Sequence, residues 1–261
     1  APGLRSAAAY LSTVHHLNLA HGHAIQVLRA RVPEALLGTV HTLQPVYPCS
    51  SADEPAALAL DAHWNGAYAH PQFCGAYPDT LAPLLEHWCR PGDLATIRQR
   101  LDWLGVNHYS PLYARCDDAA PLGFGLGEPP PGVERTAIGW PVAPADFTRT
   151  LVQAAQCYQV PLYVTENGFG GFDMPDDDGR VRDGARIDYL RRYIQAMADA
   201  VAAGADVRGY FVWSLLDNFE WSFGYRMKFG LHAVDPLTLA RLPKDSAAWY
   251  ADAVSANAVE D

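Results

Sequence analysis

The chain has 261 residues, 49% of them hydrophobic, so it can bury a sizeable core in one large α/β domain or two small ones. Its 19 basic and 29 acidic residues give a formal charge of −10, which argues against a nucleic-acid backbone or an anionic membrane surface as a partner. No apolar run approaches the roughly 20 residues that span a bilayer.

Cysteine usage indicates a reducing environment. The five cysteines are scattered, odd in number and without a CxxC pair, which argues against a disulfide framework or a zinc knuckle. The N-terminal residues also lack the basic and then apolar pattern of a signal peptide. We therefore expect free thiols and a cytoplasmic location.

The first predicted element is a helix over residues 6–31. Its apolar residues follow the 3.6-residue period up to Pro33, which stops the helix; they are Leu11, Val14, Leu17, Ala20, Ala24, Val27 and Leu28. Four histidines lie in this helix, but none has another histidine four residues away, the spacing that aims two imidazoles at one metal ion. Helix packing or surface contact is therefore preferred, and we expect no metal ion and no cofactor.

A short buried strand and a second helix follow. The run LLGTVHTL over residues 36–43 predicts the strand, which ends in a proline-rich loop. Residues 52–68 predict the helix, with Ser51 as its N-cap. We expect residues 71–79 to form a loop.

A second unit begins near residue 93. Here we expect a helix over residues 93–101 and a strand over residues 103–109 (WLGVNHY), which ends on polar and aromatic side chains. The prolines and glycines of residues 110–144 predict a long irregular segment, a feature that is usually functional or mobile. Residues 146–158 then predict an amphipathic helix.

The centre of the chain is VPLYVTENG, residues 160–168. Its β-branched and aromatic run predicts a strand that is buried on both faces, and the Asn-Gly turn places Glu166 at the carboxyl end. Residues 170–184 predict an acidic loop with a solvated face. A helix over residues 187–201 and a strand over residues 209–215 (GYFVWSL) complete the pattern.

Four apolar strands that alternate with helices predict an α/β fold with a parallel sheet, whose functional edge is the carboxyl end of every strand. Eight residues fall on this predicted edge: Asn107, His108, Tyr109, Glu166, Asn167, Trp213, Glu220 and Trp221. Carboxylates beside aromatic residues suit a sugar, because its C–H faces stack on aromatic rings and its hydroxyls need ionised acceptors. A nucleotide site is disfavoured, since the chain has no GxGxxG or GxxxxGKS/T motif.

Five segments of the chain are similar to those of a known family. They are HHLNLAHGHAIQVLRA from His15, GVNHYSPLYAR from Gly105, YVTENGFG from Tyr163, GYFVWSLLDNFEWSFGYRMKFGL from Gly209 and PKDSAAWY from Pro243. In these segments, which cover the chain nearly end to end, the sequence resembles the retaining β-glucosidases of glycoside hydrolase family 1. The TENG and DNFEW motifs are highly specific together. The resemblance implies a (β/α)8 barrel, of which the predicted strands would be strands five to eight.

The resemblance also implies roles for single residues. Glu166 would be the nucleophile, and Tyr109 would donate a hydrogen bond to it. Five further residues would form the glycone subsite, where aromatic rings would contact the sugar ring and polar side chains would hydrogen-bond its hydroxyls. They are Asn107, Trp213, Glu220, Trp221 and Phe229.

The chain departs from the family at the second catalytic group. Retaining hydrolysis needs two carboxylates about 5 to 5.5 Å apart, one a nucleophile and one a general acid that later acts as base. In the resembling family the acid/base lies in an Asn-Glu-Pro motif at the end of strand four, and this chain contains no Asn-Glu-Pro. The other candidates for the acid lie in predicted helices or loops without a supporting motif: Glu34, Glu54, Glu86, Glu128 and Glu134.

The first residues, Ala1-Pro2-Gly3, resemble the family sequence shortly after that motif. We therefore expect residues 1–261 to form a single domain, the C-terminal half of a barrel. In one interpretation, the chain is the nucleophile-bearing part of a β-glucosidase, with β-galactosides or β-fucosides as further substrates. A complementary N-terminal half-barrel chain or a second copy would complete it.

Two other functions stay open. The chain could instead be a sugar-binding or structural half-barrel without turnover. A 6-phospho-β-glycosidase is the remaining alternative. It is disfavoured because a phosphate group binds best in a pocket of cationic or hydroxyl groups, whereas this chain has Glu220 and Trp221 beside the expected glycone subsite.

The missing half also predicts exposed strand edges. The strands over residues 36–43 and 209–215 would be unpaired, and neither carries the lysines or internal prolines that protect natural edges. Four inward-facing apolar residues would lack the opposing layer of a barrel interior: Val40, Val106, Val164 and Phe211. We therefore expect that the chain is not a well-behaved active monomer.

Overall fold

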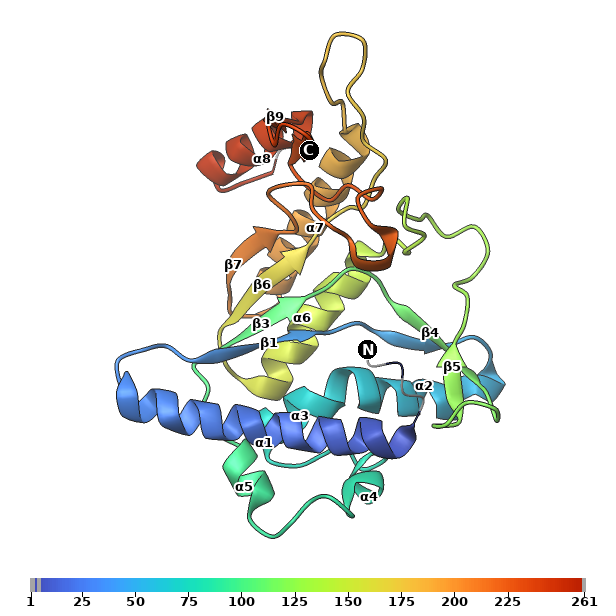
Figure 1. The fold of residues 1–261 in the computed structure, drawn as a ribbon, viewed down its shortest axis with the longest axis vertical. Helices are drawn as coiled ribbons and strands as arrows, with labels where there is room; N and C mark the ends of the chain where they lie inside the picture. Colours follow the sequence, from blue (N-terminus) through green and yellow to red (C-terminus); the bar gives the residue numbers. More distant parts are fainter. Residues whose placement is uncertain (1–2, 4–5, 260–261) are drawn as a thin grey trace. The chain divides into compact units, whose positions relative to one another are not determined.

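The computed structural model describes Gly3 and residues 6–259 (Figure 1). Ala1 and Pro2, on which part of the family resemblance rests, lie outside the described residues. The chain divides into two units. The first comprises residues 1–105, 111–131 and 154–161, and the second comprises residues 106–110, 132–153 and 162–261.

The first unit is mainly helical. Its α-helices are α1 (Ala7–Arg31), α2 (Glu54–Asp61), α3 (Ala67–Cys74), α4 (Ala82–Leu85) and α5 (Asp93–Ile97). A 3-10 turn, η1 (Ser51–Asp53), precedes α2, and a π-helical turn, η2 (Ala62–Gly66), follows it. The strands of this unit are β1 (Gly38–Thr42), β2 (Val46–Pro48), β4 (Leu112–Cys116) and β5 (Phe124–Leu126).

The long first helix forms close to its predicted range, but most of its predicted apolar face is not buried. The Ser6 side chain caps α1 by accepting a hydrogen bond from the N–H of Ala9, and α1 ends two residues before Pro33. Two of the predicted apolar residues, Leu11 and Val14, pack in a core cluster with Ala62, Ala67, Tyr77, Leu81 and Leu85. The other five predicted positions are exposed, and polar residues such as His15 and Asn18 are buried instead: Leu17, Ala20, Ala24, Val27 and Leu28 are the exposed ones. Among the described residues, no helix combines the length and the apolar character that crossing a bilayer requires.

The second helical region differs from its prediction. Ser50, rather than Ser51, stands at the N-cap position of η1, and helical backbone continues to Cys74. Pro71 lies inside α3, where a proline normally ends a helix because it lacks an N–H group and clashes with the preceding turn. Pro71 and Gln72 are buried, so packing outweighs this local preference, and the predicted loop begins only after Cys74.

The segment over residues 110–144 is less irregular than its composition suggests. β2 pairs with β4 in parallel, with Val46 opposite Leu112, and β4 pairs with β5 in antiparallel fashion, with Ala114 opposite Leu126. β4 has five residues and β5 has three, and glycines and prolines surround both. Strands this short carry too little alternation to stand out in the sequence.

The second unit contains the strands that were expected to carry the site. β6 (Leu162–Asn167) and β7 (Val207–Val212) pair in parallel, and α7 (Gly184–Ala202) lies between them in sequence. The remaining elements are η3 (Trp221–Phe223), β8 (His232–Val234), β9 (Arg241–Pro243) and α8 (Asp245–Ala256). β3 (Trp103–Asn107) and α6 (Pro144–Tyr158) are each divided between the units. The hydrogen-bonded strand order is β1-β3-β6-β7, so the first and last predicted strands stand at its ends.

Two of the four residues expected to face an unfilled interior are buried instead. The exposed fractions are 45% for Val40, 0% for Val106, 0% for Val164 and 58% for Phe211. Asn107 and Thr165 follow the two buried valines, and their side chains share a hydrogen bond of 2.7 Å. Because side chains alternate along a strand, this bond places Val106 and Val164 on the opposite face. The expectation is therefore wrong for these two residues.

The predicted acidic loop is only partly a solvated face. Asp173 and Asp183, within it, form ion pairs with Arg186 of α7, whose side chain is fully buried. Lys244 is also fully buried and lies 2.8 Å from Asp173 and 2.9 Å from Asp217. We call these five residues the ionic cluster. It joins the acidic loop to α7 and to the start of α8, while residues 176–178 remain exposed.

Candidate active site

Glu166 and Tyr109 meet at the ends of neighbouring strands. Glu166 is the fifth residue of β6, and Tyr109 lies two residues after β3. The Tyr109 hydroxyl donates a hydrogen bond of 2.7 Å to Oε2 of Glu166. The backbone N–H of His108 donates to the backbone carbonyl of Glu166 at 2.9 Å. The contact that the family resemblance implies is therefore present, and it fixes one oxygen of the carboxylate.

The Tyr109 ring stands in an aromatic group. Its centroid is 5.1 Å from that of Trp140 and 6.2 Å from that of Phe229. Burial, and then the negative charge of Glu166, raise the pKa of Tyr109 far above its ordinary value. Tyr109 is therefore a neutral hydrogen-bond donor at neutral pH.

A second carboxylate belongs to the same electrostatic environment. Burial, and then the charge of Glu166, raise the pKa of Glu220. A hydrogen bond from the indole N–H of Trp213 acts in the opposite direction, because it favours the ionised carboxylate. The structure thus brings Glu166, Glu220 and Trp213 together, although Glu220 follows Glu166 by more than fifty positions.

Trp213 is held by backbone contacts at the end of β7. Its N–H donates to the carbonyl of Asn167 at 2.9 Å, and the Trp213–Ser214 peptide bond is cis. A Cβ on Gly168 would collide with the Trp213 carbonyl, so only glycine allows this close approach. The Ser214 N–H donates to the carbonyl of Phe229 at 3.0 Å, which fixes the backbone of the aromatic wall.

Trp221 and Phe229 differ sharply in exposure. Trp221 is 80% exposed in η3, so its side chain is not part of a core. Phe229 is only 2% exposed, and its ring lies 6.1 Å from that of Trp140. Asn107 is half-buried, and its Oδ1 accepts the hydrogen bond from Thr165.

Two residues on the predicted edge do not face an open surface. Asn167 is fully buried, donating to the carbonyl of His108 at 2.7 Å and accepting from the Tyr210 hydroxyl at 2.7 Å. His108 is also fully buried, with its ring 4.9 Å from Phe147. Both residues hold strand ends together. The sequence located them at the correct edge, but it did not give the directions of their side chains.

Trp140 is a site residue that the sequence interpretation missed. It belongs to the segment that was expected to be irregular, which offered no strand end on which to place it. Its ring nevertheless completes the aromatic group with Tyr109 and Phe229. A large aromatic residue in a long loop rich in glycine and proline was the available signal.

The glutamates considered as alternative acids are all exposed: Glu34, Glu54, Glu86, Glu128 and Glu134. Glu134 forms an ion pair with Arg192 of α7 at 2.9 Å. None of the five has the combination of burial and a neighbouring carboxylate that Glu220 shows. These glutamates therefore gain no support as catalytic acids.

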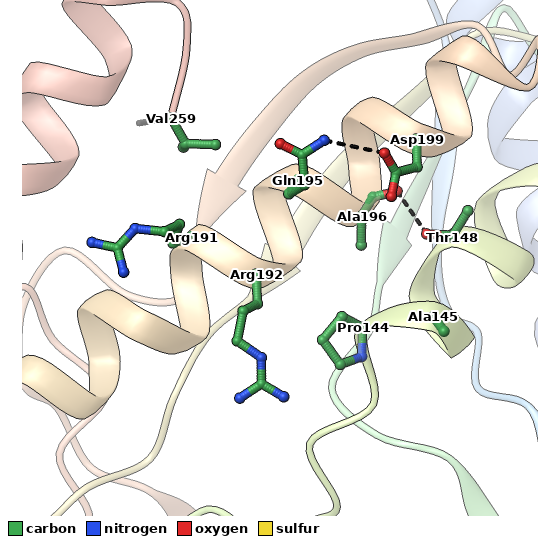
Figure 2. A pocket seen from close by; sticks show the side chains of 9 residues that line it. All are labelled: Pro144, Ala145, Thr148, Arg191, Arg192, Gln195, Ala196, Asp199 and Val259. Atoms are coloured by element: carbon green, nitrogen blue, oxygen red, sulfur yellow. Dashed lines mark hydrogen bonds between the residues drawn. The ribbon is translucent and has the colours of Figure 1, made fainter. Parts of the chain in front are cut away.

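A cavity of about 380 Å³ lies elsewhere in the second unit (Figure 2). Its walls come from the start of α6, from α7 and from the C-terminal segment: Pro144, Ala145, Thr148, Arg191, Arg192, Gln195, Ala196, Asp199 and Val259. Figure 2 shows that Gln195 donates a hydrogen bond to the Asp199 carboxylate and that Thr148 donates one to the backbone carbonyl of Ala196. None of the residues expected at the site lines this cavity, so we do not assign the active site to it.

Comparisons with known proteins identify the family of the chain. The sequence model of a family described as glycosyl hydrolase family 1 matches residues 1–259. A β-glucosidase of Agrobacterium sp. is 40% identical over 265 residues, covering 96% of this chain and 56% of that protein. A bifunctional β-D-glucosidase/β-D-fucosidase of Bifidobacterium breve is 38% identical, covering 96% of this chain and 58% of that protein.

A solved structure of a family 1 β-glucosidase is also similar to this chain. The family 1 β-glucosidase from Thermotoga maritima superposes with a TM-score of 0.91 at 34% identity. The match covers 100% of this chain and 60% of that chain. The chain thus spans between 56% and 60% of the length of these three relatives.

Proposed function

Because the chain belongs to glycosyl hydrolase family 1, we propose that it carries the nucleophile side of a retaining site that hydrolyses terminal, non-reducing β-D-glucosides. The observation that carries the proposal is the hydrogen bond from Tyr109 to Glu166 at the ends of β3 and β6. β-Fucosides and β-galactosides are the nearest alternative substrates, and the name of the Bifidobacterium breve relative supports the first of these. Family 1 β-glucosidases are (β/α)8 barrels, of which this chain covers about 60%. In this proposal, we assign β1, β3, β6 and β7 to strands five to eight of such a barrel.

The reaction proceeds in two displacements. The Glu166 carboxylate attacks the anomeric carbon, forming an ester bond, while the bond to the leaving oxygen breaks and that oxygen takes a proton from the general acid. A water molecule then attacks the same carbon, loses its proton to the residue that has become the base, and releases Glu166. The products are the free sugar, with retained configuration, and the aglycone alcohol.

Tyr109 prepares Glu166 for this attack. Its hydroxyl occupies Oε2 of the carboxylate, which leaves Oε1 to approach the anomeric carbon. The raised pKa of Tyr109 keeps the hydroxyl neutral, so the donor is in place before the substrate binds. Tyr109 acts as a preorganised donor and takes no proton.

The glycone subsite is formed by Trp213, Glu220 and Trp221. Glu220, steadied by the indole N–H of Trp213, accepts hydrogen bonds from sugar hydroxyls, and the exposed Trp221 ring offers a stacking surface. Phe229 packs against the rings of Tyr109 and Trp140, and Asn107 holds the ends of β3 and β6 together through its hydrogen bond with Thr165. A carboxylate at this position repels a phosphate, which disfavours a 6-phospho-β-glycoside as the substrate.

The general acid/base comes from a complementary segment of the fold. Within this chain, Glu220 belongs to the glycone clamp and the other candidate glutamates are exposed. The complementary segment is supplied by a longer polypeptide, by a separate chain or by a second copy. Catalysis of ordinary glycosides therefore requires the assembled site, whereas Glu166 alone suffices to react with an activated glycoside.

A covalent trap tests the role of Glu166. We expect a 2-fluoro-glucoside with a dinitrophenolate leaving group to add one glycosyl group per chain, on the peptide that contains Glu166, because a good leaving group needs no acid. Intact and peptide mass spectrometry measure the label. In the assembled protein, Glu166→Gln should lower kcat by about 10⁴-fold or more, since the amide keeps the shape but cannot attack.

Glu134→Gln is the matched control, because it alters an exposed glutamate of the same unit and should label like the wild type. A folded wild-type chain that binds glucosides but takes no label would favour the alternative function, a sugar-binding module without turnover. A label on any other residue would remove Glu166 from the mechanism.

A further inference from the structure

Three side chains of the first unit that can ligate a metal ion meet from separate segments of the chain. They are His15 of α1, Cys89 between α4 and α5, and Asp93 at the start of α5. One ligand atom from each lies within 4.8 Å of the others. We propose that these residues bind a divalent transition-metal ion, which the mixed nitrogen, sulfur and oxygen donors indicate to be zinc.

The imidazole of His15 is oriented by a second residue. His15 is fully buried; its Nε2 lies 2.9 Å from Oδ2 of Asp93, and its Nδ1 lies 3.0 Å from the hydroxyl of Tyr77. Asn18 in turn donates to the Tyr77 hydroxyl at 3.3 Å. Metal-binding histidines typically have their second nitrogen held in this way, which fixes the ring and its tautomer. Nε2 is thus the nitrogen presented to the site.

The backbone beside each ligand is anchored in one core cluster. Val14 precedes His15 and is fully buried there, while Trp88 and Leu94 pack against the same cluster beside Cys89 and Asp93. α1 also lies directly against α5, because a Cβ on Gly22 would collide with the backbone of Thr96 and Ile97. The three ligands are therefore held at fixed positions before a metal ion arrives, which is what a tight site needs.

The donor set decides which ion fits. Calcium and magnesium take oxygen ligands, so a thiol and an imidazole disfavour both. Zinc accepts all three donor types in tetrahedral geometry, and three protein ligands leave a fourth position for water. The Asp93 side chain is 20% exposed, which gives solvent access to that position. On binding, the neutral His15 imidazole offers the lone pair of Nε2 to the ion and carries its proton on Nδ1, which donates to the Tyr77 hydroxyl, and the Cys89 thiol releases its proton to solvent.

Cobalt(II) is the first probe, because its bond to a thiolate gives a charge-transfer band in the near ultraviolet. After chelator treatment, the 261-residue chain should show this band and saturate at one Co²⁺ per chain, and zinc should displace the cobalt. Zinc in large excess over its Kd should raise Tm by about 5 to 10 °C, since the ion binds the folded state. Absence of the band in the folded wild type would overturn the proposal, because the His15–Asp93 hydrogen bond is then sufficient to explain the contact.

Three variants separate the site from adventitious binding. Cys89→Ser should abolish the charge-transfer band, and Asp93→Asn should lower zinc affinity at least about tenfold while it keeps a hydrogen bond to His15. Cys157→Ser, which alters an exposed cysteine of the same unit, should bind zinc like the wild type. A band that persists in Cys89→Ser, or equal zinc affinity in all three variants, would contradict the assignment. None of these readouts depends on glycoside hydrolysis.

Discussion

At the scale of single residues, one phenolic hydroxyl controls how Glu166 presents its carboxylate. Tyr109→Phe keeps the ring between Trp140 and Phe229 but removes the donor at 2.7 Å. We expect glycosylation of the assembled enzyme to slow about 10 to 1000-fold, because a preorganised donor is lost. The loss should persist at high pH, since burial raises the pKa of Tyr109 and keeps its hydroxyl protonated there. Single-turnover kinetics across pH measure both effects.

A second half-buried tyrosine supplies the control for this prediction. Tyr47→Phe removes a hydroxyl from β2 in the first unit and should leave the rate unchanged. A Tyr109→Phe rate within error of the wild type would mean that the hydrogen bond has no role in the reaction. A loss that disappears at high pH would instead indicate that the hydroxyl ionises, because an ionised Tyr109 can no longer donate the hydrogen bond.

Trp221→Ala separates a sugar platform from a structural aromatic residue. Because Trp221 is 80% exposed, the substitution should leave the free energy of unfolding within about 0.5 kcal/mol of the wild type. Glycone binding should weaken by about 1 to 3 kcal/mol, the size of one stacking contact with its buried area. Inhibitor titration and urea unfolding measure the two quantities. Trp64→Ala, at an exposed tryptophan of the first unit, should affect neither the site nor binding.

The sequence predicts some of these residues better than others. Glu166 follows from local signals, because an unbroken apolar run and an Asn-Gly turn fix a strand end. Its contact with Tyr109 came from the family resemblance, since spacing alone does not say which strands are neighbours. Trp140 lacks any such local signal. Asn167 and His108 were located at the right edge of the sheet. Their burial depends on contacts with Tyr210 and Phe147, which lie elsewhere in the sequence and cannot be predicted from the residues next to Asn167 and His108.

At the scale of elements, Gly168 sets how closely the ends of β6 and β7 approach. Gly168→Ala places a methyl group against the Trp213 carbonyl, which is backbone and cannot rotate away. We expect a loss of about 1 to 3 kcal/mol in the free energy of unfolding. Labelling at Glu166 should also slow, because the two strand ends must separate. Urea unfolding and the rate of covalent labelling test these outcomes.

A glycine in open surroundings provides the comparison. Gly184 begins α7, and a Cβ there would meet no atom within 4 Å. Gly184→Ala should therefore be neutral or raise stability by up to about 1 kcal/mol, as expected for alanine in a helix. Equal effects of the two substitutions would show that the contact with Trp213 does not determine the spacing of the strand ends.

Helices were easier to predict than short strands. α6 and α7 extend only a few residues beyond the predicted ranges 146–158 and 187–201, because their apolar residues repeat over several turns. The helix over residues 93–101 proved shorter, since α5 ends at Ile97. β4 was missed because it pairs with the distant strand β2, and β5 was missed because its three residues carry too little local pattern.

At the scale of the whole molecule, apolar surface remains exposed beside β7. Phe211 of β7 is 58% exposed, and a groove of about 620 Å³ between α7, β7 and α8 includes Met197, Val201 and Val254. We expect the 261-residue chain, produced alone, to associate, and to hydrolyse only glycosides with activated leaving groups. Light scattering and an alkyl-glucoside assay test this. A monodisperse 28.5 kDa species with ordinary turnover would mean that an acid/base lies within these residues.

The fold class was predictable because the pattern of strands and helices and the TENG and DNFEW motifs agree. The family assignment therefore followed from sequence, and the comparisons confirm it. The metal-ligand group was not predictable in the same way. His15 and Asp93 are 78 positions apart, so a search for ligands spaced along one helix cannot find them.

The ionic cluster has a consequence for the exchange of backbone hydrogens with solvent. Asp183 accepts the N–H of Ser246, and Asp217 accepts the N–H of Gly230, each at 2.9 Å. Either amide can exchange only when its hydrogen bond to the aspartate breaks. Because the five charged side chains share partners, breaking one ion pair would leave other buried charges unpaired, so we expect the cluster to open as one unit. The amides of Ser246 and Gly230 should therefore take up deuterium at a common, slow rate. The exposed stretch over residues 176–178 should exchange much faster.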